Sequence, residues 1–177
     1  MSDQRLIITP RDLFDGASLE VSMKQKPYMG IVEIKGVIDD PGAPDHGKLV
    51  SYVNSNVITL SARKVMAMAL AGQDKVATVH WGGGTTPPQR TDPQPGWPGL
   101  LELPRIVSNI EAADAVSSTA DSIVFSSTLP ATVGTGLLLS EVGLVSANGL
   151  LVARFGFPPQ DKFDRLRLSV NWQIIII

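Results

Sequence analysis

A strict two-residue alternation runs through the C-terminal stretch RLRLSVNWQIIII, from Arg165 to Ile177. This spacing indicates a half-buried β-strand, because successive side chains of a strand point to opposite faces of the sheet. If its apolar face is buried, the face contributes on the order of 10 kcal/mol. We therefore expect this strand to be central to the fold. The apolar face consists of Leu166, Leu168, Val170, Trp172, Ile174 and Ile176.

Two isoleucines, Ile175 and Ile177, break the alternation on the opposite face, which is otherwise polar. Apolar surface held in place by a central strand is the kind that a neighbouring chain covers. We expect a neighbour, rather than the chain itself, to cover these two side chains. The sequence thus predicts Ile175 and Ile177 as interface residues of a homo-oligomer.

Short strand patterns separated by turn residues fill much of the remaining chain, which contains 16 Gly and 13 Pro. Strands are predicted at 28–39, 75–81, 100–112 and 121–130, with a loop at 40–47 and a strand or extended connection at 48–60. Two apolar runs around Asn148-Gly149 predict a hairpin, because this dipeptide suits tight turns between antiparallel strands. The pattern predicts a mainly β protein, an antiparallel β-sandwich.

The clearest helical segment is SARKVMAMALAG, from Ser61 to Gly72. Ser61 is the expected N-cap, Gly72 suits the position after the last turn, and Val65, Met68 and Ala69 form the expected apolar stripe. About three turns of helix are too short to be stable alone in water. We expect this one short helix to pack on a sheet.

The composition excludes several kinds of site. The formal net charge of −2 gives no electrostatic basis for binding nucleic acid or an anionic membrane. The chain has no cysteine and two histidines, so disulfides and thiolate sites are excluded and zinc is disfavoured. The sequence contains no apolar run of membrane-spanning length and no signal-peptide pattern. We expect synthesis in a cytosol, with neither cofactor nor metal.

No catalytic constellation stands out. The stretch GGGTTPP (82–88) could expose backbone N–H groups to a phosphate, but it lacks the Lys of a P-loop and runs into prolines, which favours a connecting loop. Asp39, Asp40, Asp45 and His46 lie close together without the spacing of a cation-binding loop. His80 is expected to be a core or interface residue, and Glu102, Glu111 and Glu141 form no recognisable acid–base pair. The sequence predicts a protein that is not an enzyme.

Two tryptophans could contact other molecules. Trp97 lies in the Pro-Gly-rich segment 82–99, where a lone aromatic side chain is typical of an anchor into a partner. Together with Trp81 it could instead form a stacking platform for carbohydrate. We favour contact with another chain, and both residues are interface candidates.

The segments KVMAMALAG, KVATVHWGGGTTPPQRTD and SIVFSSTLP, followed by residues 137–174, resemble a family of small structural proteins of tailed-bacteriophage virions, described as tail-collar or neck-fibre proteins. The resemblance covers about residues 57–177, and its C-terminal half is the more specific part. The matching positions are Gly82–Pro88, Glu141, Gly143, Leu144, Leu151–Arg154, Phe157–Pro159, Lys162, Asp164, Leu168, Val170, Trp172 and Ile174.

The resemblance implies a structural role in a virion, with the protein made in the bacterial cytoplasm. Residues 57–177 are then the β-sandwich domain, and residues 1–56 are an extended attachment arm or additional strands. The expected partners are other virion proteins of the neck, tail or capsid and further copies of the chain, with a trimer preferred. Two alternatives remain open, a capsid decoration protein and a carbohydrate-binding adhesin module.

Overall fold

The computed structural model describes residues 28–47, 49–92, 106–115 and 122–176. Within these ranges the chain forms ten strands and one short helix. In chain order they are β1 (Tyr28–Ile38), β2 (Leu49–Ser55), β3 (Val57–Ile58), α1 (Ser61–Leu70), β4 (Val76–Gly82), β5 (Ile106–Asn109), β6 (Ala112–Ala115), β7 (Ser122–Leu129), β8 (Leu137–Ser146), β9 (Leu151–Lys162) and β10 (Leu166–Ile176).

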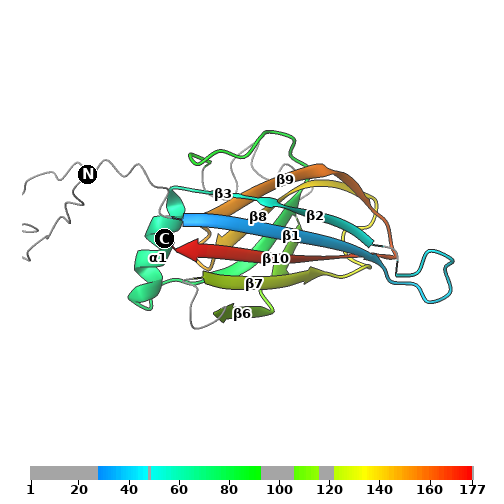
Figure 1. Ribbon diagram of the computed structural model, residues 1–177, viewed down its shortest axis with the longest axis horizontal. Helices are drawn as coiled ribbons and strands as arrows, with labels where there is room; N and C mark the ends of the chain where they lie inside the picture. Colours follow the sequence, from blue (N-terminus) through cyan, green and yellow to red (C-terminus); the bar gives the residue numbers. More distant parts are fainter. Residues whose placement is uncertain (1–27, 48, 93–105, 116–121, 177) are drawn as a thin grey trace, which may run out of the picture.

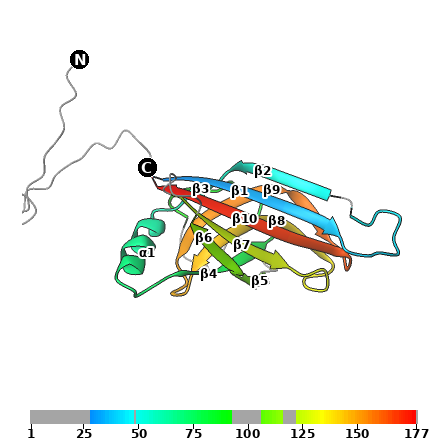
Figure 2. The same ribbon diagram turned by 60° about the horizontal axis from the view of Figure 1, so that its bottom comes forward.

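Two antiparallel sheets face each other, and α1 lies at one end of them (Figures 1 and 2). Sheet A has the strand order β2-β1-β10-β7-β6, and sheet B has the order β3-β9-β8-β4-β5. The main apolar core lies between the inner faces of the two sheets, and it includes Trp172 from sheet A and Trp81 from sheet B. The predicted mainly β fold, an antiparallel β-sandwich with one short helix, is confirmed.

The C-terminal strand β10 is the middle strand of sheet A, as its alternation predicts. It pairs along its whole length with β1, from Leu166 opposite Ile38 to Ile176 opposite Tyr28. On its other side it pairs with β7. Its apolar face is buried as far as the structure describes the side chains, at Leu166, Leu168, Val170, Trp172 and Ile174.

The predicted domain boundary at residue 57 is wrong. Strands β1 and β2 belong to sheet A, and the inward side chains Val32 and Ile34 are part of the core. The central strand β10 cannot be paired on one side without β1, so residues 28–56 are part of the sandwich. Of the two alternatives given for residues 1–56, additional strands is therefore correct for residues 28–56. Residues 1–27 lie outside the described residues.

On each side of the sandwich, a short connecting segment passes from one sheet to the other. The chain leaves β2 in sheet A and enters β3 in sheet B through Asn56, whose N–H donates to the Gly30 carbonyl at 3.0 Å. On the opposite side, Ile110 and Glu111 connect β5 to β6, and their N–H groups donate to carbonyls of Ala77 and Ser126. These connections give neighbouring strands backbone partners in both sheets.

Helix α1 differs in detail from its prediction. Leu60, not Ser61, is the N-cap, and no side chain caps the helix. Ala62 and Val65 are the buried residues, whereas Met68 is half-buried and Ala69 is exposed. The stripe is displaced because the first turns of the helix pack against β9 of the sandwich. Gly72 has the predicted role, with φ +69°.

The predicted hairpin is formed by β8 and β9, with Asn148 and Gly149 in its turn. Gly149 has φ +80°, a left-handed conformation that costs residues with a Cβ free energy. Its N–H donates to the Ser146 carbonyl at 2.9 Å, and the N–H of Ser146 donates to the Leu150 carbonyl at 2.9 Å. The turn therefore depends on glycine for its backbone conformation.

We predict that Gly149→Ala lowers the free energy of unfolding by about 1–2 kcal/mol, the cost of a left-handed L-residue. A Cβ at position 149 would meet no atom within 4 Å, so the loss is conformational and not steric. Urea unfolding measures it. Gly42→Ala is the matched control, because Gly42 has no positive φ and ample space, and it should leave stability unchanged or slightly raised. Equal effects of the two substitutions would contradict this account.

Candidate functional site: a buried ion-pair cluster beneath an exposed loop

Two charged residues of opposite sign interrupt the apolar strands of the β8–β9 hairpin. Glu141 on β8 faces Gly156, and Arg154 on β9 faces Gly143. The alternate pairs of the same hairpin, such as Val142 with Phe155, belong to the core. Glu141 and Arg154 therefore project from the face of sheet B that points away from the core. Because each lies opposite a glycine, the two long side chains have room along the sheet.

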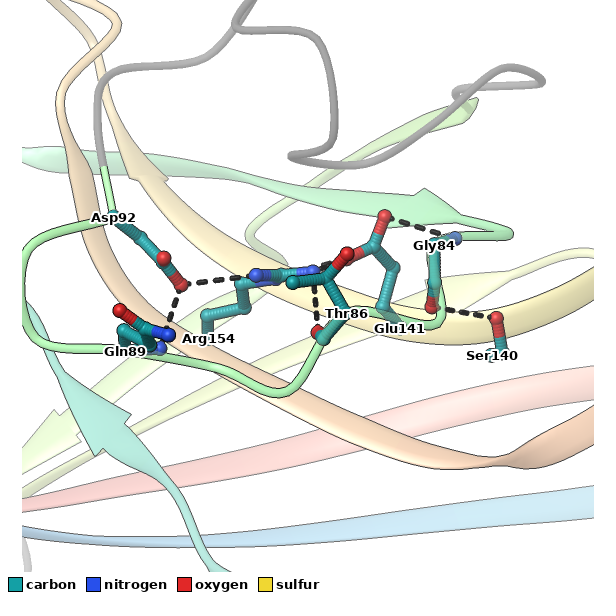
Figure 3. A network of polar contacts seen from close by, with 7 residues as sticks. All are labelled: Gly84, Thr86, Gln89, Asp92, Ser140, Glu141 and Arg154. Carbon is teal, nitrogen blue, oxygen red and sulfur yellow. Dashed lines mark hydrogen bonds and ion pairs between the residues drawn. The ribbon is translucent and has the colours of Figure 1, made fainter.

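Asp92 completes this ion-pair cluster, which we define as Asp92, Glu141 and Arg154 (Figure 3). Arg154 Nε donates to Glu141 Oε2 at 2.8 Å, and Arg154 Nη2 donates to the same oxygen. Arg154 Nη1 donates to Asp92 Oδ2 at 3.0 Å. The side chains of Arg154 and Glu141 have no exposed surface, and that of Asp92 is 7% exposed.

The cluster also binds the backbone of residues 83–92, which we call the clamped loop. Arg154 Nη2 donates to the Thr86 carbonyl at 3.0 Å, and Asp92 Oδ2 accepts the N–H of Gln89 at 2.9 Å. Figure 3 shows the loop passing over the cluster, with the two carboxylates on either side of the guanidinium. A fully buried arginine thus fixes the path of a loop whose own side chains are mostly exposed.

Gly84 is the residue of the clamped loop that bonds to both Glu141 and Ser140 of the sheet. Its N–H donates to Glu141 Oε1 at 3.1 Å, and its carbonyl accepts the Ser140 hydroxyl at 2.8 Å. A Cβ at this position would overlap the Glu141 carboxylate. The glycine-rich segment does present a backbone N–H to an anion, as a phosphate-binding loop would, but the anion is the protein's own Glu141.

The cluster is suited to holding structure in place. Each of its charges contacts an opposite charge, and its carboxylates also accept backbone N–H groups, which offsets the cost of burying them. Among the described residues, no group of three or more His, Asp or Glu side chains is placed to hold a metal ion. In the same part of the chain, no helix is both long and apolar enough to cross a membrane.

The interface prediction for Trp81 is wrong. Its side chain has no exposed surface, and its Nε1 donates to Ser108 Oγ at 2.9 Å inside the sandwich. It lies on the inner face of β4, opposite Val142, because the alternation of that strand points it into the core. Trp81 therefore cannot stack on a sugar or contact a partner, and Trp97 lies outside the described residues.

Ile175 lies on the outer face of sheet A, as predicted, and is half-buried, while Ile177 lies outside the described residues. Their role as interface residues remains a prediction.

Nearby on the same face, a polar ladder crosses three strands. Lys35 pairs with Glu33 at 2.9 Å, Asn171 Nδ2 donates to Glu33 Oε2 at 3.2 Å, and Ser126 Oγ donates to Asn171 Oδ1 at 3.0 Å.

The acidic loop at 39–47 lies beside Arg165, just before β10, and Arg167 of β10. Asp40 and Asp45 lie 3.4 and 4.0 Å from Arg165 Nη1, and Asp39 lies 3.7 Å from Arg167 Nε. The side chains of these pairs are 36–47% exposed. The carboxylates therefore have cationic partners within the chain, and His46 of the same loop is exposed.

The remaining candidates have structural partners. Glu111 accepts the N–H and the hydroxyl of Thr128 at 3.1 and 3.0 Å. His80 lies on the outer face of sheet B opposite Gly143, and its Nε2 is 3.2 Å from Thr78 Oγ1. Glu102 lies outside the described residues.

Sequence reasoning did not identify Asp92 or the role of Arg154, and it treated Glu141 as an unassigned carboxylate. A signal was present, because LLLSEVGLV and LVARF each contain one charge within an apolar run, and the charges are opposite. Across a predicted hairpin such charges indicate a buried pair. Asp92, more than sixty residues away from Arg154, had no comparable signal.

Comparisons with protein-family models, curated proteins and solved structures find no match for this chain.

We predict that Arg154→Met lowers the free energy of unfolding by about 3–5 kcal/mol, because two carboxylates are left buried without their guanidinium. Urea unfolding measures the loss. The clamped loop should also open, and the exposed Arg90 within it should then be cut faster by trypsin.

The matched control is Arg167→Met, since Arg167 pairs with Asp39 at 3.7 Å and is 47% exposed. It should cost less than about 1 kcal/mol and leave cleavage at Arg90 unchanged. Similar losses for the two variants would show that the buried cluster contributes no more than a surface pair.

The polar ladder predicts a pH effect. Hydrogen bonds from Lys35 and then Asn171 lower the pKa of Glu33 below its usual 4.5, against the opposing effect of burial. The folded protein thus binds fewer protons here than the unfolded chain, so this stabilisation is full above pH 4.5 and is lost as pH falls through the folded-state pKa. The stability difference between wild type and Glu33→Gln should be largest at neutral pH and shrink in acid. Asn171→Ala should weaken this pH dependence, and a difference independent of pH would contradict the prediction.

Proposed function

We propose that the chain is a non-enzymatic structural component of a tailed-phage virion, a neck, collar, tail or baseplate fibre-type protein. It acts through contacts with other virion proteins and with further copies of itself. It is made in the bacterial cytoplasm and functions in the particle. The proposal rests on the resemblance described above and on one structural observation, the clamping of an exposed loop by a buried ion-pair cluster.

The clamped loop has the properties of a contact surface. Thr85, Thr86, Pro87 and Arg90 are exposed, while the backbone between Gly84 and Asp92 is held by buried charges. A loop that is rigid before binding loses little conformational entropy when it meets a partner. Three buried charges that fix the loop backbone therefore favour binding if an assembly requires one particular shape of the loop.

The same residues carry much of the resemblance. Gly84, Glu141 and Arg154 belong to the matching positions and meet in one hydrogen-bonded network, although Gly84 lies 57 residues from Glu141 (Figure 3). Lys162, another matching residue, is buried and donates to the Ala131 carbonyl at 2.6 Å. Because several matching positions are residues of this buried network, the resemblance is consistent with a structural unit that the chain shares with the virion-protein family.

The test is the composition of virus particles produced by the genome that encodes this chain. Quantitative mass spectrometry of washed particles should detect the chain at tens of copies or fewer, as a neck or tail component requires. Hundreds of copies would support the capsid decoration alternative. Absence of the chain from washed particles would refute both structural roles.

Disruption of the reading frame should yield incomplete particles in electron micrographs. Wild type and Arg167→Met should restore complete particles, and Arg154→Met should not, because its contact loop is no longer held. Normal assembly and infectivity after the disruption would refute a structural role.

A further inference from the structure

Strand β2 is the longest edge strand in the described part of the chain, and it forms the outer edge of sheet A (Figure 2). Among the described residues, β1 is its one pairing partner. The edge of sheet B on the same side is different, because β3 has two residues and the following Leu60 N–H donates to the Arg90 carbonyl of the clamped loop. The open hydrogen-bonding edge therefore belongs to β2.

The register identifies which backbone groups of β2 are unpaired. Asn56 N–H donates to the Gly30 carbonyl, and this pair continues the β1–β2 register. Because hydrogen-bonded and non-hydrogen-bonded pairs alternate in antiparallel sheets, Tyr52 and Asn54 direct their backbone groups to β1. Leu49, Ser51, Val53 and Ser55 direct theirs to the open edge. Asn54 Oδ1 accepts the Ser55 N–H at 2.8 Å, which leaves the N–H groups of Leu49, Ser51 and Val53 for a partner.

The edge lacks the usual protection against strand pairing. Natural proteins block open edges with charges, prolines or bulges. The sequence of β2, LVSYVNS, contains neither charge nor proline, and its pairing with β1 has no bulge. Val53 is 61% exposed. An uncharged, regular and exposed edge is a template for adding another strand.

We propose that β2 pairs antiparallel with β2 of a second copy, across a two-fold axis at Tyr52. In this register Ser51 lies opposite Val53 of the partner subunit and Val53 opposite the partner's Ser51. Each of these two central pairs exchanges two N–H···O bonds, which gives four bonds next to the axis. The contact is self-complementary, as a two-fold dimer requires. The two five-stranded sheets become one continuous sheet of ten strands.

Side chains on both faces fit this pairing. Tyr52 is half-buried, with its ring 5.8 Å from that of Phe157, and the partner's Tyr52 covers the remaining surface. On the outer face, Glu33 lies beside Val53 and Lys35 beside Ser51. Each row across the junction therefore runs from Glu33 through Val53 and the partner's Ser51 to the partner's Lys35, so the strands that meet place no like charges opposite each other.

This inference stands independently of the virion role, and it differs from the trimer expected from sequence, because a two-fold edge contact closes with two copies. Light scattering of the full-length protein should give twice the chain mass of 18.9 kDa. If other contacts between copies build a larger oligomer, the mass of that oligomer should fall by half when the β2 edge is blocked.

Val53→Pro blocks the edge selectively, because it removes an N–H that points away from β1, and it should halve the mass. Val53→Lys is a second variant with no backbone constraint, and it should have the same effect. The matched control is Val107→Pro on the edge strand β5. Val107 is 47% exposed, and its N–H also points away from its neighbour, since the Ile110 N–H bonds to Ala77 and sets the alternation. This control should keep the wild-type mass.

The register itself can be tested because the chain has no cysteine. At the two-fold axis the Cα atoms of the two Tyr52 residues lie about 4.5 Å apart, within the range for a disulfide. Tyr52→Cys should form a covalent dimer on oxidation, whereas Asn54→Cys should not. A wild-type mass of one chain, a mass unchanged by both Val53 variants, or preferential cross-linking at position 54 would overturn the proposal.

Discussion

Burial of one face of β10 is the constraint on which the arrangement of sheet A depends. The strand lies between β1 and β7, and Trp172 at its centre has no exposed surface. A shift of the pairing by one residue would turn Trp172 and its apolar neighbours to solvent, so the register of both adjacent strands is fixed. The same parity places Glu33, Asn171 and Ser126 together on the outer face, where they form the polar ladder.

The ion-pair cluster places a second constraint on the opposite sheet. An apolar replacement could hold the hairpin together equally well, because burying charges has a large desolvation cost. Apolar side chains could not, however, hydrogen-bond to Gly84, Thr86 and Gln89 at fixed positions. The charges therefore specify the path of the clamped loop more than they add to stability. We regard this specificity as the reason for a charged cluster in an otherwise apolar hairpin.

The edges of the sandwich connect the fold to its assembly. Connections at Asn56 and at Ile110–Glu111 tie the two sheets together, and the clamped loop bonds to the chain just after β3. The edge of β2 has no such cover among the described residues and has no protecting charge. Two features thus point outward, a rigid loop over sheet B and an open edge on sheet A, and both are suited to contacts with other chains.

Local patterns in the sequence determined most strands, the hairpin turn and the central position of β10, because side-chain period and turn chemistry act over a few residues. They did not show that the segments 48–60 and 100–112 each contain residues of two strands, one in each sheet. The turn at Gly149 and the buried face around Trp172 follow directly from such patterns. Amphipathic periodicity also located helix α1, but not its buried face, which is set by packing against β9. The same local reasoning placed Trp81 at an interface, although strand pairing turns it into the core.

Tertiary structure alone decided the contacts between distant segments. It joined β1 and β2 to the sandwich, because the sequence of β10 does not say which strand pairs beside it. It also brought Asp92 to Arg154 and Gly84 to Glu141, since the sequence around a residue does not indicate which distant residue it will contact. Local geometry is determined by neighbouring residues and can be predicted from them. Partners across sheets are chosen by the packing of the whole chain.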